Sequence, residues 1–73
     1  MKTYLAIWFS TDGKKTSQIS ERLFSMGFKP TQGNYDFVYE WKRKPSIDAI
    51  LALADQVHET LKDSGVYFKM ETI

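Results

Sequence analysis

The chain contains no cysteine, one histidine and two prolines. Without cysteine there are no disulfides and no thiolate metal sites, so a reducing cytosol is the expected compartment. No apolar run is long enough to span a bilayer, and we expect neither a signal peptide nor a membrane partner. The formal net charge of +1 gives no general attraction for nucleic acid. These absences exclude disulfide-stapled, membrane-spanning and strongly basic proteins.

The composition that remains is typical of a small folded protein. Seventy-three residues suit one domain, spanning residues 1–73. Hydrophobic residues make up 42% of the chain and aromatic residues 15%, which favours a globule over a disordered chain. Each aromatic ring buries a large area with few rotatable bonds, which helps a core of limited size.

The first part of the chain predicts a strand followed by a helix. Apolar residues occupy both faces of a strand over Lys2–Ser10. Thr11 or Asp12 then offers an N-cap for a helix over Lys14–Met26, because both side chains accept backbone N–H bonds. Gly27 follows, where a left-handed residue commonly ends a helix.

The middle of the chain predicts a β-hairpin. Phe28–Gln32 is a short extended segment, and Gly33 with Asn34 is a two-residue hairpin signal. Tyr35–Lys42 then alternates as a strand. Pro30 cannot donate a ladder hydrogen bond, so the shorter strand belongs at the sheet edge. Without this reversal, the alternative is a three-stranded β-α-β-α-β sheet.

The last part predicts a second helix and a final strand. Ser46 is the expected N-cap and Gly65 closes the helix. Val66–Thr72 alternates as the last strand. The predicted buried stripe of this helix consists of Ile47, Ile50, Leu51, Ala54, Val57 and Leu61.

Together these elements predict an α+β, ferredoxin-like β-α-β-β-α-β sandwich. The four-stranded antiparallel sheet has the expected order 4-1-3-2, with both helices on one face. The predicted helix-facing layer of the sheet is Leu5, Ile7, Phe9, Phe37, Tyr39, Trp41, Val66, Phe68 and Met70. The first helix adds Ile19, Leu23 and Met26.

The helix-free face of this sheet is the first candidate binding surface. An exposed aromatic surface indicates a partner, and a homodimer through this face or along a sheet edge is the favoured interpretation. Stacking of single-stranded RNA is an alternative, although the outward carboxylates of Asp36 and Glu40 oppose a phosphate backbone. The predicted interface or stacking residues are Tyr4, Trp8, Val38 and Tyr67.

Two clusters of cations are candidate anion sites. Lys14 and Lys15 precede the first helix, where anions are attracted. Lys42, Arg43 and Lys44 lie between the third strand and the second helix, where a nucleic-acid backbone is a candidate ligand. Solvated side chains with no ligand are the favoured interpretation of both clusters.

No catalytic or metal-binding constellation is recognisable. His58 is the only histidine and has neither a partner nor a pocket that the sequence reveals. The carboxylates are scattered along the chain. We therefore expect no metal site, no cofactor and no catalytic residue, and leave enzymatic activity open.

One segment resembles a known group of small proteins. Residues 26–35, with Gly27-Phe28 and Gln32-Gly33 as their most specific pairs, are similar to the segment that joins the first helix to the next two strands in the VapD and Cas2 families. The strand of residues 4–10 is also similar in character. The resemblance covers about the first half of the chain. It implies a ferredoxin-like fold, a homodimer and metal-dependent nuclease activity.

The chain departs from those families at the end of the first strand. The resemblance places an aspartate there, and this chain has Phe9 and Ser10. Asp12 follows two residues later and is the only candidate acid for a nuclease. The sequence therefore favours a non-enzymatic cytoplasmic binding or self-association module, with a nuclease or a passive single-strand binder as alternatives.

Overall fold

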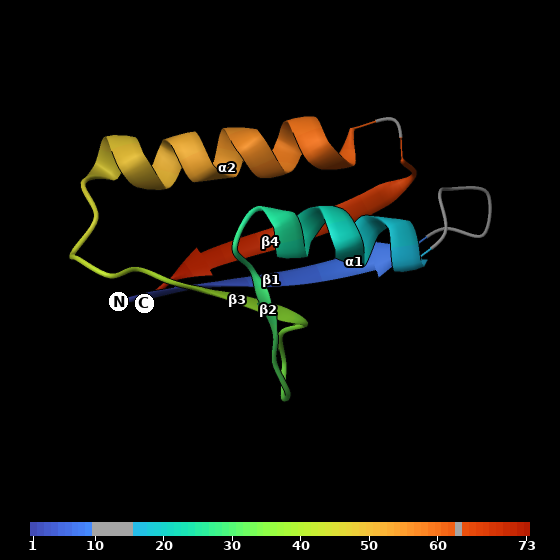
Figure 1. Ribbon diagram of the computed structural model, residues 1–73, viewed down its shortest axis with the longest axis horizontal. Coiled ribbons are helices and arrows are strands. Elements are labelled where there is room, and N and C mark those ends of the chain that lie inside the picture. The colour runs from blue at the N-terminus through green and yellow to red at the C-terminus, as the bar shows by residue number, and fades with distance from the viewer. Residues whose placement is uncertain (10–15, 63) are drawn as a thin grey trace.

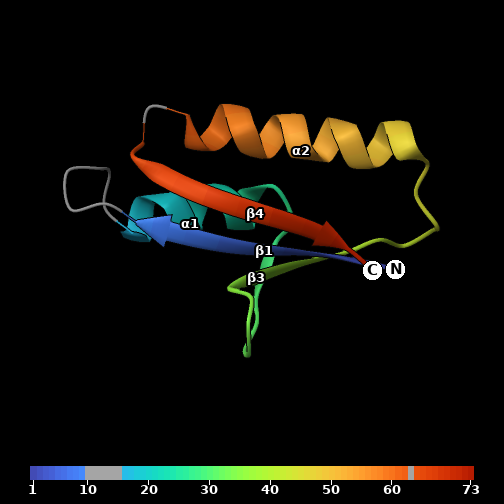
Figure 2. The same ribbon diagram turned by 180° about the vertical axis from the view of Figure 1, so that it is seen from behind.

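The computed structural model describes residues 1–9, 16–62 and 64–73. The elements run in the order β1 (Lys2–Phe9), α1 (Thr16–Ser25), β2 (Lys29–Pro30), β3 (Phe37–Glu40), α2 (Ile47–Leu61) and β4 (Val66–Thr72). The strands form one antiparallel sheet of order β2-β3-β1-β4, and both helices lie on the same face of it (Figures 1 and 2). This confirms the predicted α+β, ferredoxin-like arrangement.

The centre of the sheet is the long pair of β1 and β4. Their register runs from Thr3 opposite Thr72 to Phe9 opposite Val66. The two chain ends lie side by side (Figure 1), and Ile73 exchanges two backbone hydrogen bonds with residue 2, of 2.9 and 3.1 Å. The pair of β1 with β3 is shorter and stops at Leu5.

The chain reverses where the sequence predicts. Lys29 pairs with Val38 and Pro30 pairs with Phe37, which places residues 33 and 34 midway between β2 and β3. Gly33 has a φ of 101°, in the left-handed region that glycine adopts without strain. The three-stranded alternative is therefore wrong.

Both strands of this hairpin are shorter than predicted. The expected spans were Phe28–Gln32 and Tyr35–Lys42, whereas β2 has two residues and β3 has four. Pro30 has no N–H to donate, and the last bond before the tip is donated by the Thr31 N–H to the Asp36 carbonyl at 3.0 Å. Beyond it, the chain leaves the ladder and the tip hangs away from the sheet (Figure 1).

Helix α1 ends close to its predicted boundary. Its last residue is Ser25, one before Met26, and Gly27 follows with a φ of 104°. The Phe28 N–H donates to the Leu23 carbonyl at 3.1 Å, which closes the last turn. The predicted start at Lys14 and its caps lie outside the described residues.

Helix α2 has the N-cap that the sequence predicts. The Ser46 hydroxyl accepts from the Ala49 N–H at 3.1 Å. At the other end the Lys62 N–H donates to the His58 carbonyl, and Gly65 has a φ of 73°.

The buried face of α2 differs from the prediction. Ile47 is 75% exposed and Leu51 is 56% exposed, whereas Leu53, absent from the predicted stripe, is buried. Continued by helical spacing, the stripe of Ile47 and Leu51 reaches Asp55 and His58, so burying it would bury a carboxylate. Turning Leu53 inward leaves those polar groups in water. The buried residues of α2 are Leu53, Val57 and Leu61.

The core lies between the sheet and the two helices. Its buried members are Leu5, Ile7, Ile19, Leu23, Phe28, Phe37, Leu53, Val57 and Leu61. The half-buried residues packed against it are Met26, Tyr39, Trp41, Val66, Phe68 and Met70. The predicted sheet layer is largely confirmed, although the side chain of Phe9 is outside the description. Phe28 and the polar residues Thr3 and Ser64 are buried without having been predicted so.

Candidate functional site

The open face of the sheet carries the predicted aromatic surface. Of the elements that the structure describes, none covers the side opposite the helices. Trp8 and Tyr67 lie directly opposite each other on β1 and β4. They are 56% and 76% exposed, so most of their apolar area is in contact with water. Such a cross-strand aromatic pair is costly to leave bare and suits a partner.

A second aromatic pair flanks this face. Tyr4 stacks on Tyr35 with ring centroids 5.1 Å apart, and the Tyr35 hydroxyl donates to the Glu71 carboxylate. Tyr4 is half-buried, as is Val38. All four predicted interface residues belong to this face, but only Trp8 and Tyr67 are widely exposed.

The structure corrects the predicted position of Tyr35. Strict alternation over Tyr35–Lys42 predicts that it shares a face with Phe37, whereas its ring packs against Tyr4 on the open face. Alternation fails because β3 begins only at Phe37. Tyr35 belongs to the hairpin tip, where side chains no longer follow the pleat.

A shallow depression separates the two aromatic pairs. Ala6 lies between Tyr4 and Trp8 along β1 and is 7% exposed, although no described element covers it. The larger side chains around it exclude water from its methyl group. Lys69 lies opposite on β4 and is exposed. The open face therefore has a ridge at Trp8 and Tyr67 and a dip at Ala6.

Asp36 has a structural task at the end of the β1–β3 ladder. Its N–H donates to the Leu5 carbonyl at 2.9 Å, and its carboxylate accepts the Ile7 N–H at 2.9 Å. The side chain thus replaces the backbone acceptor that β3 would supply if it continued. Its acceptor capacity is partly used within the fold, which argues against a catalytic role.

The charges of the open face are mixed in sign. Lys2 and Glu40 are cross-strand partners with Nζ and Oε1 3.5 Å apart. Lys69 and Glu71 both belong to β4 and are exposed. This balance gives a phosphate backbone little attraction to the face.

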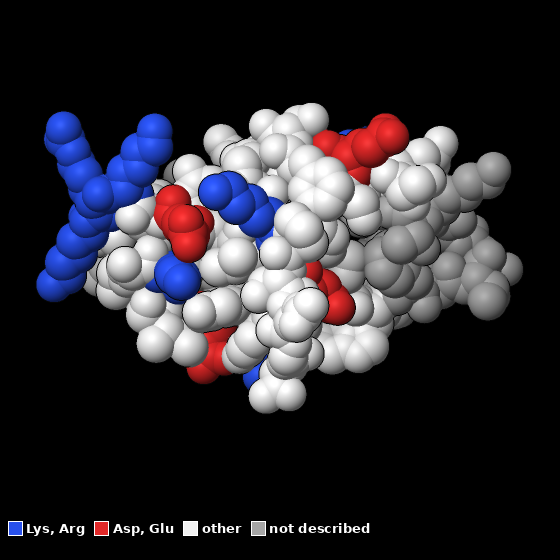
Figure 3. All heavy atoms as spheres, turned by 60° about the horizontal axis from the view of Figure 1, so that its bottom comes forward, with Lys and Arg blue, Asp and Glu red and all other residues white. Residues whose placement is uncertain are grey.

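The predicted cation cluster lies at one end of the molecule. Lys42, Arg43 and Lys44 are all exposed in the loop between β3 and α2. Figure 3 shows Lys and Arg side chains projecting together from this end. Lys14 and Lys15, the other predicted anion site, lie outside the described residues.

Two adjoining hollows lie beside this cluster, and they were not predicted. The smaller, of about 380 Å³, is lined by Gly27, Lys29, Tyr39, Glu40, Trp41 and Lys42. The larger, of about 560 Å³, extends along the loop to Ser46 and Ala49 at the start of α2. Tyr39, Glu40, Trp41 and Lys42 line both hollows. The sequence signal was the alternation that placed Tyr39 and Trp41 together, but it assigned both to the core.

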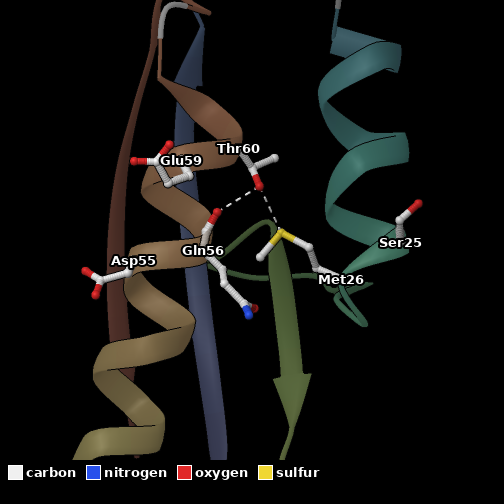
Figure 4. Close-up of a pocket in the computed structure, with 6 residues that line it drawn as sticks. All are labelled: Ser25, Met26, Asp55, Gln56, Glu59 and Thr60. Carbon is white, nitrogen blue, oxygen red and sulfur yellow. Dashed lines mark hydrogen bonds between the residues drawn. The ribbon is translucent and has the colours of Figure 1, made fainter.

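A third hollow lies between α1 and α2, and its lining residues form no catalytic or ligand-binding arrangement (Figure 4). It has a volume of about 650 Å³. The Thr60 hydroxyl is bonded to Met26 Sδ and the Gln56 carbonyl. The carboxylates of Asp55 and Glu59 point away from α1 in Figure 4. This hollow is a packing gap between helix ends.

Catalytic and metal-binding arrangements are not found among the residues that the structure describes. In this part of the chain, no three His, Asp or Glu side chains are grouped so that they could hold a metal ion. His58 is exposed on α2. Asp12, the one candidate nuclease acid, lies outside the description. No helix in the described ranges is long and apolar enough to cross a bilayer.

No protein-family model, curated protein or solved structure matches this chain. The resemblance to the VapD and Cas2 families, and the nuclease activity that it implies, stay predictions from the sequence.

Proposed function

We propose that this chain is a small self-association module whose open sheet face packs against that of a second copy. The supporting observation is the cross-strand pair of Trp8 and Tyr67, two large rings left mostly in water on a face without helices. Packing a second sheet there would cover both rings and the dip at Ala6. The absence of cysteine supports a cytosolic setting.

The pattern on the face is complementary to itself. A two-fold axis running between β1 and β4, parallel to them, would set each residue of β1 over its register partner on β4 of the second copy. Trp8 would meet Tyr67, and Ala6 would receive the aliphatic stem of Lys69. Tyr4 would meet Glu71, whose carboxylate can accept a hydrogen bond from the Tyr4 hydroxyl.

The charges of the face also suit a second copy. Within the overlaid strands, Lys2 and Lys69 carry positive charge and Glu71 carries negative charge. Each copy would therefore present both signs to its partner. Electrostatic complementarity of this kind fixes register and suppresses wrong partners. A polyanionic partner would be repelled by Glu71.

The size of the face limits the affinity. The axis between β1 and β4 overlays these two strands on their counterparts, and two strands at about 4.8 Å with seven residues at about 3.3 Å give a flat footprint of roughly 220 Å². Standard interfaces take about 800 Å² of accessible surface from each partner. Side-chain relief adds to this footprint, but the interface stays smaller than the standard size and is of the weak, transient kind. We expect a dissociation constant of about 1–100 μM.

The test is sedimentation equilibrium or light scattering with size-exclusion chromatography across this concentration range. The double variant Trp8→Ser with Tyr67→Ser removes the exposed ridge and should be monomeric at every concentration. The matched control is Ile47→Ser with Leu51→Ser on α2, since Leu51 and Trp8 share the same exposed fraction of 56%. The control should dimerise like the parent chain.

Two results would contradict the proposal. One is a parent chain that stays monomeric at about 500 μM, well above the expected dissociation constant. The other is dimerisation that survives the Trp8 and Tyr67 substitutions. Loss of dimerisation in the α2 control alone would move the interface to the helices. Circular dichroism on each variant separates loss of the dimer from loss of the fold.

A further inference from the structure

The two adjoining hollows at the β3–α2 end combine aromatic walls with cations. Tyr39 and Trp41 are half-buried and pack edge to face, with ring centroids 4.9 Å apart. They line both hollows, so part of each side chain borders the open space. The Trp41 indole N–H donates to Thr3 Oγ1 at 2.8 Å, which holds the ring in place. The hollows thus have a preformed aromatic wall.

The cations around this wall form no close ion pair among the described residues. In the described part of the chain, ion pairs within 4 Å join Lys2 to Glu40 and Lys62 to Glu59, and no others are formed. Lys29, Lys42 and the neighbouring Arg43 and Lys44 line the hollows without a carboxylate partner at that distance. Glu40 also lines both hollows, but its carboxylate is paired with Lys2. The net field in the hollows is therefore positive.

The start of α2 adds little to this field. The Ser46 hydroxyl already takes the Ala49 N–H, and Asp48 places a negative charge in the first turn. An anion in the larger hollow would depend on the three consecutive cations of the loop. These side chains are long enough to close over a phosphate group.

We propose that these hollows bind a nucleotide, with its base against Tyr39 and Trp41 and its phosphates held by Lys42, Arg43 and Lys44. The larger hollow, of about 560 Å³, lies in the usual range for small-molecule sites. A planar base uses the aromatic wall, and the phosphates use the cations of the loop. Neither an apolar ligand nor a bare anion would use both.

Trp41 provides a direct readout. The chain has two tryptophans, so Trp8→Phe leaves Trp41 as the only indole and keeps a ring on the open face. Titrating this variant with ADP should quench the emission of Trp41, because the base contacts its ring. An exposed site of this kind is expected to have a dissociation constant of about 0.1–1 mM. Adenosine and inorganic pyrophosphate, each with half of the features, should bind at least about fivefold more weakly.

The charge requirement is tested by substitution. In the Trp8→Phe background, changing Lys42, Arg43 and Lys44 to Gln should weaken ADP binding at least about tenfold, because the phosphates lose all three cations of the loop. The matched control removes three cations elsewhere, by changing Arg22, Lys62 and Lys69 to Gln. The control should change the affinity less than about threefold, through the general field alone.

Four outcomes would overturn the proposal. The first is no quenching at about 5 mM ADP, several times the expected dissociation constant. The second is pyrophosphate binding as tightly as ADP, which would indicate a plain anion patch. The third is equal loss in both triple variants. The fourth is a single-stranded oligonucleotide that binds while ADP does not, which would assign the cluster to a nucleic-acid strand.

Discussion

A buried hydroxyl network holds the end of the sheet together and offers the sharpest test of the fold. Thr3 is fully buried on β1. Its Oγ1 accepts from the Trp41 indole N–H at 2.8 Å and lies 2.8 Å from Thr72 Oγ1. One hydroxyl thus links β1 to β4 and to the residue that follows β3. We expect Thr3→Val to break both links while keeping the shape of the side chain.

The size of the effect follows from what is left unpaired. A buried donor without a partner costs about 1–3 kcal/mol. Trp41 and Thr72 are only half-buried, so water can reach them and the cost falls toward the lower end. We expect Thr3→Val to lower the free energy of unfolding by about 1–2 kcal/mol. For a domain of this length, that lowers the melting temperature by about 4–16 °C.

The assay is a double-mutant cycle of Thr3→Val and Trp41→Phe. The urea unfolding of each variant is monitored by far-UV circular dichroism. The indole N–H bond to Thr3 should appear as a coupling free energy of about 0.5–1.5 kcal/mol between the two substitutions. The companion variant Thr3→Ser keeps the hydroxyl and its bond to Trp41, so the cycle of Thr3→Ser with Trp41→Phe should show no coupling. A coupling within about 0.3 kcal/mol of zero in the cycle of Thr3→Val would refute the reasoning, because the bond would then contribute nothing to stability.

The remaining predictions concern the buried face of α2 and two glycines. Leu53→Ala should lower the free energy of unfolding by about 2–4 kcal/mol and Leu51→Ala by less than about 0.5 kcal/mol, measured in urea, because only Leu53 is buried; the reverse order would restore the stripe predicted from sequence. Gly33→Ala should cost about 1–2 kcal/mol through its φ of 101° alone, since a Cβ there meets no described atom within 4 Å. Gly27→Ala should cost more, since its Cβ would also lie 3.1 Å from Tyr39 Cε2; equal shifts in melting temperature would contradict this.

The order of the elements follows from local signals in the sequence. Serine is among the residue types that most often cap helices, and Ser46 caps α2 as expected. Gly33 marks the reversal, and the observed register centres on it and Asn34. Such features depend on neighbours within a few residues. They are therefore visible in a single sequence.

The details that the sequence missed depend on contacts across the fold. Leu51, Ala52 and Leu53 are consecutive and apolar, so periodicity alone does not choose which of them faces the core. Thr3 is polar and read as an ordinary strand residue, yet partners 38 and 69 positions away satisfy it in the interior. Alternation predicts that Tyr35 shares a face with Phe37. The strand begins only at Phe37, however, and the ring of Tyr35 stacks on Tyr4 instead.

The two proposed sites lie on opposite faces of the same sheet, which follows from the pleat. Trp8 and Val38 point away from the helices, whereas Tyr39 and Trp41 pack against the core on the helix side. A dimer through the open faces would therefore leave the two hollows of each chain facing outward and accessible. Glu40 is the point of contact between the sites, because it lines the hollows while its carboxylate pairs with Lys2. A surface pair of this kind contributes at most about 1 kcal/mol, so self-association and ligand binding should be nearly independent.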